Sequence, residues 1–316
     1  MKEINDYGEV FENIVQKTSE YLTNNNIKAM VLGISGGIDS TVCAAICHEV
    51  SKRTNIPLIG RSLPTAFNKK DEINSADLVG KAFCNDYKEV NIQNWYTEIS
   101  DQLFYTEKTP RKIICNGNIQ ARLRMMYLYD LAGNNNGIVI DTDNLTENNL
   151  GYFTIHGDVG DFNPIGGLWK TEVFKLAEWI MNWYGSYTHT YFYTDSPEMI
   201  EYKQGNLYKA RAIKESLKLN PTAGLGITNN DLEELGAESY EQVDYVIQEI
   251  LAWKWLNLEY RGYKYDSIKE MRNAFLEEQQ MLDIPVDVII AVTDRHFNSE
   301  FKRKQLPIRI NREDIL

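Results

Sequence analysis

Strand-like and helix-like segments alternate along the first two thirds of the chain. Apolar residues recur at helical spacing over 7–25, and the apolar run 29–34 predicts a first buried strand, followed by a second helix. Further strands are expected over 56–63, 90–92 and 137–141, and further helices over 68–83, 118–132 and 170–184. This alternation is typical of a doubly wound parallel α/β sheet, which binds ligands at the carboxyl ends of its strands.

The last third of the chain predicts helices almost throughout, most clearly over 240–258 and 266–282. It is rich in Trp and Tyr, which more often pack cores or subunit contacts than bind cofactors. We therefore expect one domain over 1–316, with an N-terminal helix in 1–26 and a helical extension over about 197–316.

Composition narrows the class of protein. A formal net charge of -12 argues against a nucleic-acid partner, whose phosphates need clustered Lys and Arg. The N-terminus has no targeting pattern and no apolar run approaches eighteen residues, so we expect a cytoplasmic protein without a membrane partner. The four cysteines form no CxxC pair, which favours reduced thiols over a metal site.

The segment Ser35-Gly36-Gly37-Ile38-Asp39-Ser40 directly follows the first predicted strand and opens a helix. Adjacent glycines let the backbone approach a ligand, and the helix N-terminus presents unpaired N–H groups to an anion. The pattern is neither Gly-x-x-x-x-Gly-Lys-Ser/Thr nor Gly-x-Gly-x-x-Gly. It predicts a phosphate site, with an ordinary Gly-Gly turn as the alternative.

This turn resembles the PP-loop of the ATP pyrophosphatases, which cleave ATP between its α- and β-phosphates. Three later segments resemble NAD synthetases: 116–126 their GNxxARxRM helix, 141–147 their TDxxxE segment, and 151–158 their G(F/Y)FTxxGD segment. Residues 220–223 and 302–307 are similar to the family's PTA element and basic tail. The chain is identified as a member of the NAD synthetase family, of the ammonia-dependent type.

The resemblance implies an adenine nucleotide alpha hydrolase-like fold and an ATP-dependent ligase. Its substrates would be deamido-NAD, ATP and ammonia, and its products NAD, AMP and pyrophosphate, formed through an acyl-adenylate. Mg²⁺ would be the cofactor, and the protein would be a homodimer with the substrate at the interface. Free ammonia is the expected donor, because only about thirty residues precede the turn, too few for the glutaminase domain of glutamine-dependent members.

The resemblance also implies site residues. Asp39, Arg122 and Lys170 would be catalytic, and Asp39 and Glu147 would hold the metal. The remaining assignments fall into two groups: Gly33, Ser35, Gly36, Gly37, Ser40, Arg122, Thr142, Lys170 and Thr222 for ATP and pyrophosphate, and Tyr21, Asn118, Arg122, Asp158, Lys302 and Arg303 for deamido-NAD. Arg124 is expected to point to the opposite side of its helix from Arg122.

Each assignment has a structural alternative: a helix cap for the threonines and carboxylates, an ion pair for the arginines, and a core position for Tyr21. Ile113-Ile114-Cys115 stands where some members have an aromatic residue for the nicotinate ring. Two other functions stay open, another PP-loop adenylating ligase, for amidation or tRNA modification, and a non-catalytic nucleotide-binding paralogue.

Overall fold

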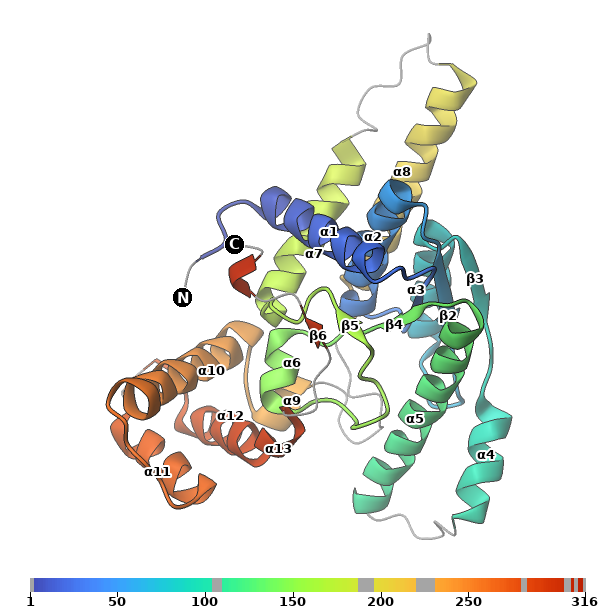
Figure 1. The fold of residues 1–316 in the computed structure, drawn as a ribbon. Coiled ribbons are helices and arrows are strands. Elements are labelled where there is room, and N and C mark those ends of the chain that lie inside the picture. The colour runs from blue at the N-terminus through green and yellow to red at the C-terminus, as the bar shows by residue number, and fades with distance from the viewer. Residues whose placement is uncertain are drawn as a thin grey trace.

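The part of the chain that the structure describes is built on a parallel sheet of six strands in the order β3-β2-β1-β4-β5-β6 (Figure 1). The computed structural model describes residues 3–103, 110–186, 196–219, 231–279, 283–303, 308–309 and 312–314. The strands are β1 (Met30–Gly33), β2 (Leu58–Ser62), β3 (Asp86–Glu89), β4 (Ile138–Ile140), β5 (Phe162–Asn163) and β6 (Ile308–Arg309). The chain leaves β1 toward β2 on one side and later returns to β4 on the other, which makes the β1/β4 boundary the switch point of the sheet.

Helices cover both faces of the sheet. Successive side chains of the central strand β1 point to opposite faces, and each face is buried in a different core. Met30 and Leu32 join the larger core, while Ala29 and Val31 join the smaller one. The larger core is covered by α1 (Tyr7–Asn24), α2 (Ile38–Thr54), α3 (Lys70–Phe83), α7 (Lys170–Ser186) and α8 (Pro197–Ser216), and the smaller one by α4 (Gln93–Gln102) and α5 (Pro110–Asn134). The predicted doubly wound α/β fold is confirmed.

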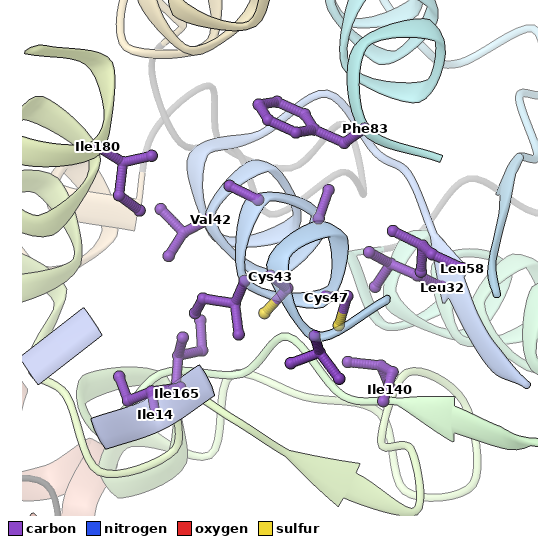
Figure 2. Packing of buried hydrophobic residues seen from close by; sticks show 14 of the residues in the cluster. Ile14, Leu32, Val42, Cys43, Cys47, Leu58, Phe83, Ile140, Ile165 and Ile180 are labelled. Atoms are coloured by element: carbon purple, nitrogen blue, oxygen red, sulfur yellow. The ribbon is translucent and has the colours of Figure 1, made fainter. Parts of the chain in front are cut away.

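Helix α2 lies at the centre of the larger core. Figure 2 shows the Cys43 and Cys47 thiols among apolar side chains of the sheet and the surrounding helices. Both thiols are free, and burial raises their pKa above the ordinary value, so they remain protonated. This helix carries the phosphate-binding turn at its N-terminus, and its packing on all sides fixes the direction of that terminus.

A second core lies among the C-terminal helices, where α10 (Tyr240–Lys254) and α12 (Val286–Asn298) pack against α6 (Leu145–Leu150). Figure 1 shows this group on the far side of the molecule from α4 and α5. The other elements here are α9 (Asp231–Leu235), the π-helical turn η1 (Trp255–Tyr260), α11 (Ile268–Glu278), α13 (Glu300–Arg303) and the 3₁₀ turn η2 (Arg312–Asp314). No helix of the described residues has the length and apolar character required to cross a membrane.

Three strands depart from the prediction. β3 ends at Glu89, before the expected 90–92, and its sequence Asp-Tyr-Lys-Glu carries no apolar alternation because it lies at the sheet edge. β5 and β6 are two residues each and were not predicted. β6 brings the end of the chain to the edge of the sheet beside β5, in a part of the sequence expected to be helical.

Candidate active site

A cavity of about 330 Å³ opens at the carboxyl ends of β1, β2 and β4, at the switch point of the sheet. Its walls come from the β1–α2 turn, the segment after β2 and the start of α3, one face of α5, the loop after β4, α6 and the loop that follows it, and the first residue of α7. Segments distant in sequence therefore converge on one site.

The β1–α2 turn is shaped to hold an anion. Gly36 has φ +87°, and a Cβ there would lie 2.3 Å from the Glu72 carbonyl oxygen, so only glycine fits. Gly37 is the N-cap of α2, and Ser40 Oγ donates to its carbonyl at 3.0 Å. Ser35 Oγ accepts a 3.2 Å hydrogen bond from Gly37 N–H. The open N-terminus of α2 and the Ser35 hydroxyl thus face the cavity, where a phosphate group would meet both.

Two buried hydroxyls support this turn from behind. Ser75 of α3 and Ser216 at the end of α8 both donate to the Gly36 carbonyl, at 2.8 Å and 2.5 Å. Ser216 also lies 2.5 Å from the Thr41 hydroxyl. The sequence pattern indicated neither serine, because their positions matter only once α3 and α8 pack together.

An ion group formed by Lys170, Asp39 and Glu147 lies beside the turn. Lys170 Nζ is 2.6 Å from Asp39 Oδ2 and 2.9 Å from Glu147 Oε1, and its side chain is 1% exposed. Burial alone would lower the pKa of Lys170, but the two carboxylates raise it well above its ordinary value, so the ammonium stays charged. Predicted residues from α2, α6 and α7 are thereby brought together.

Asn144 holds the two carboxylates in this arrangement. Its amide donates to Asp39 Oδ1 at 2.9 Å, and its carbonyl oxygen accepts from Glu147 N at 3.0 Å in the capping box that opens α6. The Asn144 backbone N–H also donates to Glu147 Oε2 at 3.2 Å, so the remaining oxygens, Asp39 Oδ2 and Glu147 Oε1, both face the Lys170 ammonium. Mg²⁺ commonly takes one or two protein carboxylates and completes its shell with water and phosphate oxygens, so this donor pair fits it.

The two arginines of α5 lie the other way round from the expectation. Arg124 lines the cavity, donating to the Leu63 carbonyl at 3.0 Å and to Asn68 Oδ1 at 3.1 Å. Arg122 is exposed, lies outside the cavity wall and donates to the Ile155 carbonyl at 3.4 Å. Residues two positions apart on a helix point to roughly opposite sides, and α5 packs against the sheet with the side that carries Arg124. Any role of Arg122 in binding stays a prediction.

Two buried carboxylates, Asp141 and Asp143, follow β4, and the carboxylate of the exposed residue Asp158 lines the cavity from the loop between α6 and β5. Desolvation raises the pKa of Asp141 to about 7 and that of Asp158 to about 6. Asp158 lines the cavity and accepts from Thr154 N at 2.6 Å. Asp143 is also buried, and its pKa is raised by burial and then by the charge of Asp141. The raised pKa values mean that these carboxyl groups bind protons more readily than exposed ones, which limits the negative charge that accumulates near Asp39 and Glu147.

Comparison with known proteins assigns this architecture. The sequence profile of the NAD synthase family matches residues 10–306, most of the chain. The chain belongs to the NAD synthase family. The NH₃-dependent NAD⁺ synthetase of Thermoplasma volcanium is 31% identical over 250 residues, which cover 79% of this chain and 84% of that protein. The enzyme of the same name from Campylobacter jejuni is 34% identical over 176 residues, 55% of this chain and 68% of its own length.

Solved structures give the same assignment. The NMN synthetase of Francisella tularensis superposes with a TM-score of 0.67 at 25% identity, covering 95% of this chain and 97% of its own. The NH₃-dependent NAD synthetase of Campylobacter jejuni gives a TM-score of 0.50 at 28% identity, over 65% of this chain and 96% of its own. The family resemblance inferred from the motifs is confirmed.

The residues assigned by resemblance to the NAD synthase family fall into two groups, one that lines the cavity and one that lies outside it. One set lines the cavity: Gly33, Ser35, Gly37, Asp39, Thr142, Glu147, Asp158 and Lys170. Gly36 and Ser40 lie in the same turn, and Thr222 lies outside the described residues. These positions agree with an ATP site, and their individual roles remain predictions.

The residues assigned to deamido-NAD, Asp158 apart, lie outside this cavity. Tyr21 stacks on Phe162 with ring centroids 4.4 Å apart, which is the structural alternative for that position. Asn118 accepts from Thr154 Oγ1 at 2.8 Å. Lys302 donates to the carbonyls of Gly151 and Phe153, at 2.8 Å and 2.6 Å. Arg303 similarly donates to the Asn149 carbonyl at 2.7 Å. The two basic residues thus brace the loop after α6.

Proposed function

We propose that this chain catalyses the ATP-dependent amidation of deamido-NAD by ammonia, giving NAD, AMP and pyrophosphate through an acyl-adenylate. It is a ligase that forms a C–N bond. The observation that carries this proposal is the contact of Lys170 with both Asp39 and Glu147 beside an anion-binding turn, in a chain of the NAD synthase family.

The first step joins two anions, because an oxygen of the nicotinate carboxylate attacks the α-phosphorus of ATP while the bond to the pyrophosphate oxygen breaks. The N-terminus of α2, Ser35 and Ser40 would hold the leaving pyrophosphate. Lys170 would place a permanent positive charge beside it, and Arg124 a second one on the cavity wall. Mg²⁺ held by Asp39 and Glu147 would supply further positive charge to the phosphates.

In the second step, ammonia attacks the acyl carbon, the nitrogen loses a proton and AMP leaves. Asp158 lines the cavity, and in its ionised form it would attract ammonium to the site. The charge of the chain, -12, argues against a tRNA acceptor. The ATP that the reaction consumes supports a location in the cytoplasm.

A homodimer is supported by α5. Arg122 and Met126 lie one helical turn apart on it, and Met126 is 60% exposed. The neighbouring Ile114 and Tyr129, and Trp95 of α4, also expose apolar surface. Pairing two such faces would bury this surface and bring Arg122 to the interface, where the acceptor substrate would bind.

A second acceptor has a specific observation behind it. The Francisella tularensis structure that covers 95% of this chain is an NMN synthetase, whose name implies the mononucleotide as product. Nicotinate mononucleotide and deamido-NAD carry the same carboxylate and differ in the adenylyl group. The chemistry at Asp39, Glu147 and Lys170 is the same for both.

The decisive assay measures AMP and amide formation by the purified protein with ATP, Mg²⁺ and ammonium, in parallel tubes with deamido-NAD and nicotinate mononucleotide. A further tube replaces ammonium with glutamine. NAD and AMP in equal amounts with ammonium alone establish the proposal, and a higher kcat/KM with the mononucleotide assigns the second acceptor. AMP without amide favours another adenylating ligase, and neither product favours a nucleotide-binding paralogue.

A further inference from the structure

Helix α10, in the C-terminal helical part, contacts the residues on both sides of the ion group. Asp244 is 2% exposed and lies against the N-terminus of α7. Its Oδ2 accepts from the Thr171 amide at 3.2 Å and from the Thr171 hydroxyl at 2.8 Å. Its Oδ1 accepts from the Thr146 hydroxyl. Thr171 directly follows Lys170, and Thr146 directly precedes Glu147.

A third hydrogen bond closes this arrangement, because the Lys170 amide donates to Thr146 Oγ1 at 2.8 Å. The start of α6 and the start of α7 are therefore joined to each other and to one carboxylate of α10. A shift of Asp244 would therefore act at the same time on the residue that follows Lys170 and on the residue that precedes Glu147.

The face of α10 that carries Asp244 also lies beside the ammonium of Lys170. Tyr240 lies one helical turn before Asp244, and its ring centroid is 5.7 Å from Lys170 Nζ. A ring at this distance attracts an ammonium through its negative face. Lys170 is thus held at its backbone by Asp244 and beside its ammonium by Tyr240.

We propose that Asp244 and Tyr240 are positioning residues that fix the Lys170 ammonium between Asp39 and Glu147, an inference that rests on the proposed function of that site. Through them, the C-terminal helices form part of the catalytic machinery without touching substrate. The placement matters because a displacement of about 1 Å in a catalytic group can cost about 10²-fold in rate.

Packing alone does not require a carboxylate at position 244. Val243, Val246 and Ile247 already anchor α10 in the second core. Burial raises the pKa of Asp244 to about 6, so ionising it inside the protein at neutral pH opposes folding. An ionised carboxylate is, however, the strongest acceptor for the amide and two hydroxyls that flank Lys170 and Glu147, and for the positive end of α7.

The test compares Asp244→Ala, Asp244→Asn and Tyr240→Leu with two controls. Glu241→Ala removes an exposed carboxylate from the same helix, and Val246→Ala weakens the second core without contacting the ion group. ATP affinity is measured by calorimetry without acceptor, and kcat, the KM for ATP and ammonium, and the melting temperature are measured in parallel. The calorimetric measurement needs no turnover, so it decides the inference even where no amide forms.

We expect Asp244→Ala to weaken ATP binding about tenfold and to lower kcat by about 10²-fold with the KM for ammonium unchanged. Asp244→Asn, which keeps one acceptor oxygen, should recover part of both losses. Tyr240→Leu should weaken ATP binding about threefold. Glu241→Ala should match the wild type, and Val246→Ala should lower the melting temperature while ATP affinity stays within twofold.

Two results would overturn the inference. The first is ATP affinity within twofold of the wild type in both Asp244 variants. The second is a loss in Asp244→Ala no greater than that in Val246→Ala at an equal drop in melting temperature. A wild-type protein that binds ATP but forms no amide would contradict the proposed function alone, and the binding series would still decide the role of Asp244.

Discussion

The hydroxyl of Ser216 donates a 2.5 Å hydrogen bond to the carbonyl of Gly36, across 180 positions of sequence. Ser75 donates to the same oxygen at 2.8 Å. Because the C=O and the following N–H point in opposite directions across a planar peptide, drawing this carbonyl inward directs the Gly37 N–H to the other side, where it donates to the Ser35 hydroxyl. The end of α8 therefore sets the orientation of the turn that would hold pyrophosphate.

Removing the Ser216 hydroxyl should weaken ATP binding without unfolding the protein. A hydrogen bond of this kind contributes about 0.5–1.5 kcal/mol, so Ser216→Ala should raise the KM for ATP about two- to tenfold. The KM for ammonium should not change. Ser100→Ala is the control, since Ser100 donates to the Thr97 carbonyl at 3.0 Å in α4 and does not line the cavity. Equal KM values for ATP in Ser216→Ala and Ser100→Ala would contradict this role.

Gly36→Ala should abolish nucleotide binding. Its Cβ would lie 2.3 Å from the Glu72 carbonyl and 2.8 Å from the Ala76 amide nitrogen, both backbone atoms, and the φ of +87° is strained for any side chain. We expect a loss of ATP affinity of at least about 10²-fold, because the turn must shift away from α3. Calorimetric titration with ATP checks it.

Gly133→Ala supplies the control, because a Cβ there meets nothing within 4 Å near the end of α5. Alanine has a higher helix propensity than glycine, by up to about 1 kcal/mol, so this variant should be as stable as the wild type or more so. Similar ATP affinity in the two glycine variants would show that the turn tolerates a side chain.

The arginines of α5 offer a test that separates the two substrates. Arg124 lines the cavity and Arg122 does not, so Arg124→Ala should raise the KM for ATP about tenfold or more. Arg122→Ala should leave the KM for ATP within twofold and instead raise the KM for the nicotinate nucleotide, if this residue lies at a dimer interface. Steady-state kinetics with each substrate varied in turn measures both, and a reversed pattern would contradict the placement.

Site residues could be predicted from the sequence only where they belong to a motif in one short segment of the chain. The Gly36-Gly37 turn and the carboxylates Asp39 and Glu147 lie within seven residues of the end of a buried strand, so the motif and the strand pattern predict them at one edge of the sheet. Ser75, Ser216 and Asp244 escaped notice because each contacts the site from an element distant in sequence. The hydrophobic periodicity of a helix does not indicate which of its ends packs against a turn elsewhere in the chain.

The strands show the same limit. β1 and β4 are apolar and β2 is fully buried, because both faces of the sheet are covered there, and their positions are close to those predicted. The edge strand β3 is polar, and β5 and β6 are too short to show a pattern. Which of Arg122 and Arg124 faces the cavity could not be predicted, because helical spacing fixes the relative direction of the two side chains but not which side of α5 meets the sheet.

Replacing Lys170 tests the metal site without an activity assay. In Lys170→Met, Asp39 and Glu147 lose the ammonium that lies 2.6 Å and 2.9 Å away, and two like charges remain close together. We expect a loss of stability of up to about 3 kcal/mol in EDTA. Mg²⁺ should restore more stability to this variant than to the wild type, because the ion replaces the missing charge.

Thermal melts with and without Mg²⁺ measure this difference, and Asp39→Ala and Glu147→Ala complete the set. Both should abolish turnover while retaining the fold. A melting temperature of Lys170→Met that does not respond to Mg²⁺, together with near-normal rates in both carboxylate variants, would show that this pair holds no metal.

Asp244 should make the protein less stable as pH rises from about 4 to 7. Burial, and to a lesser extent the charge of Glu172, raise its folded-state pKa to about 6 from an ordinary value of 3.8. Between these values the folded protein retains a proton that the unfolded chain has released, so stability falls through this window and levels off above it. The shift corresponds to about 3 kcal/mol.

Asp244→Asn removes this dependence, whereas Asp141 and Asp158, which titrate in a similar range, are retained. The difference in unfolding free energy between variant and wild type, measured by urea titration, should therefore rise in favour of Asp244→Asn between about pH 4 and pH 7. Parallel stability curves would contradict the raised pKa. A variant more stable at pH 8 yet slower in turnover would indicate that the carboxylate is retained for the position of Lys170 and not for the stability of the fold.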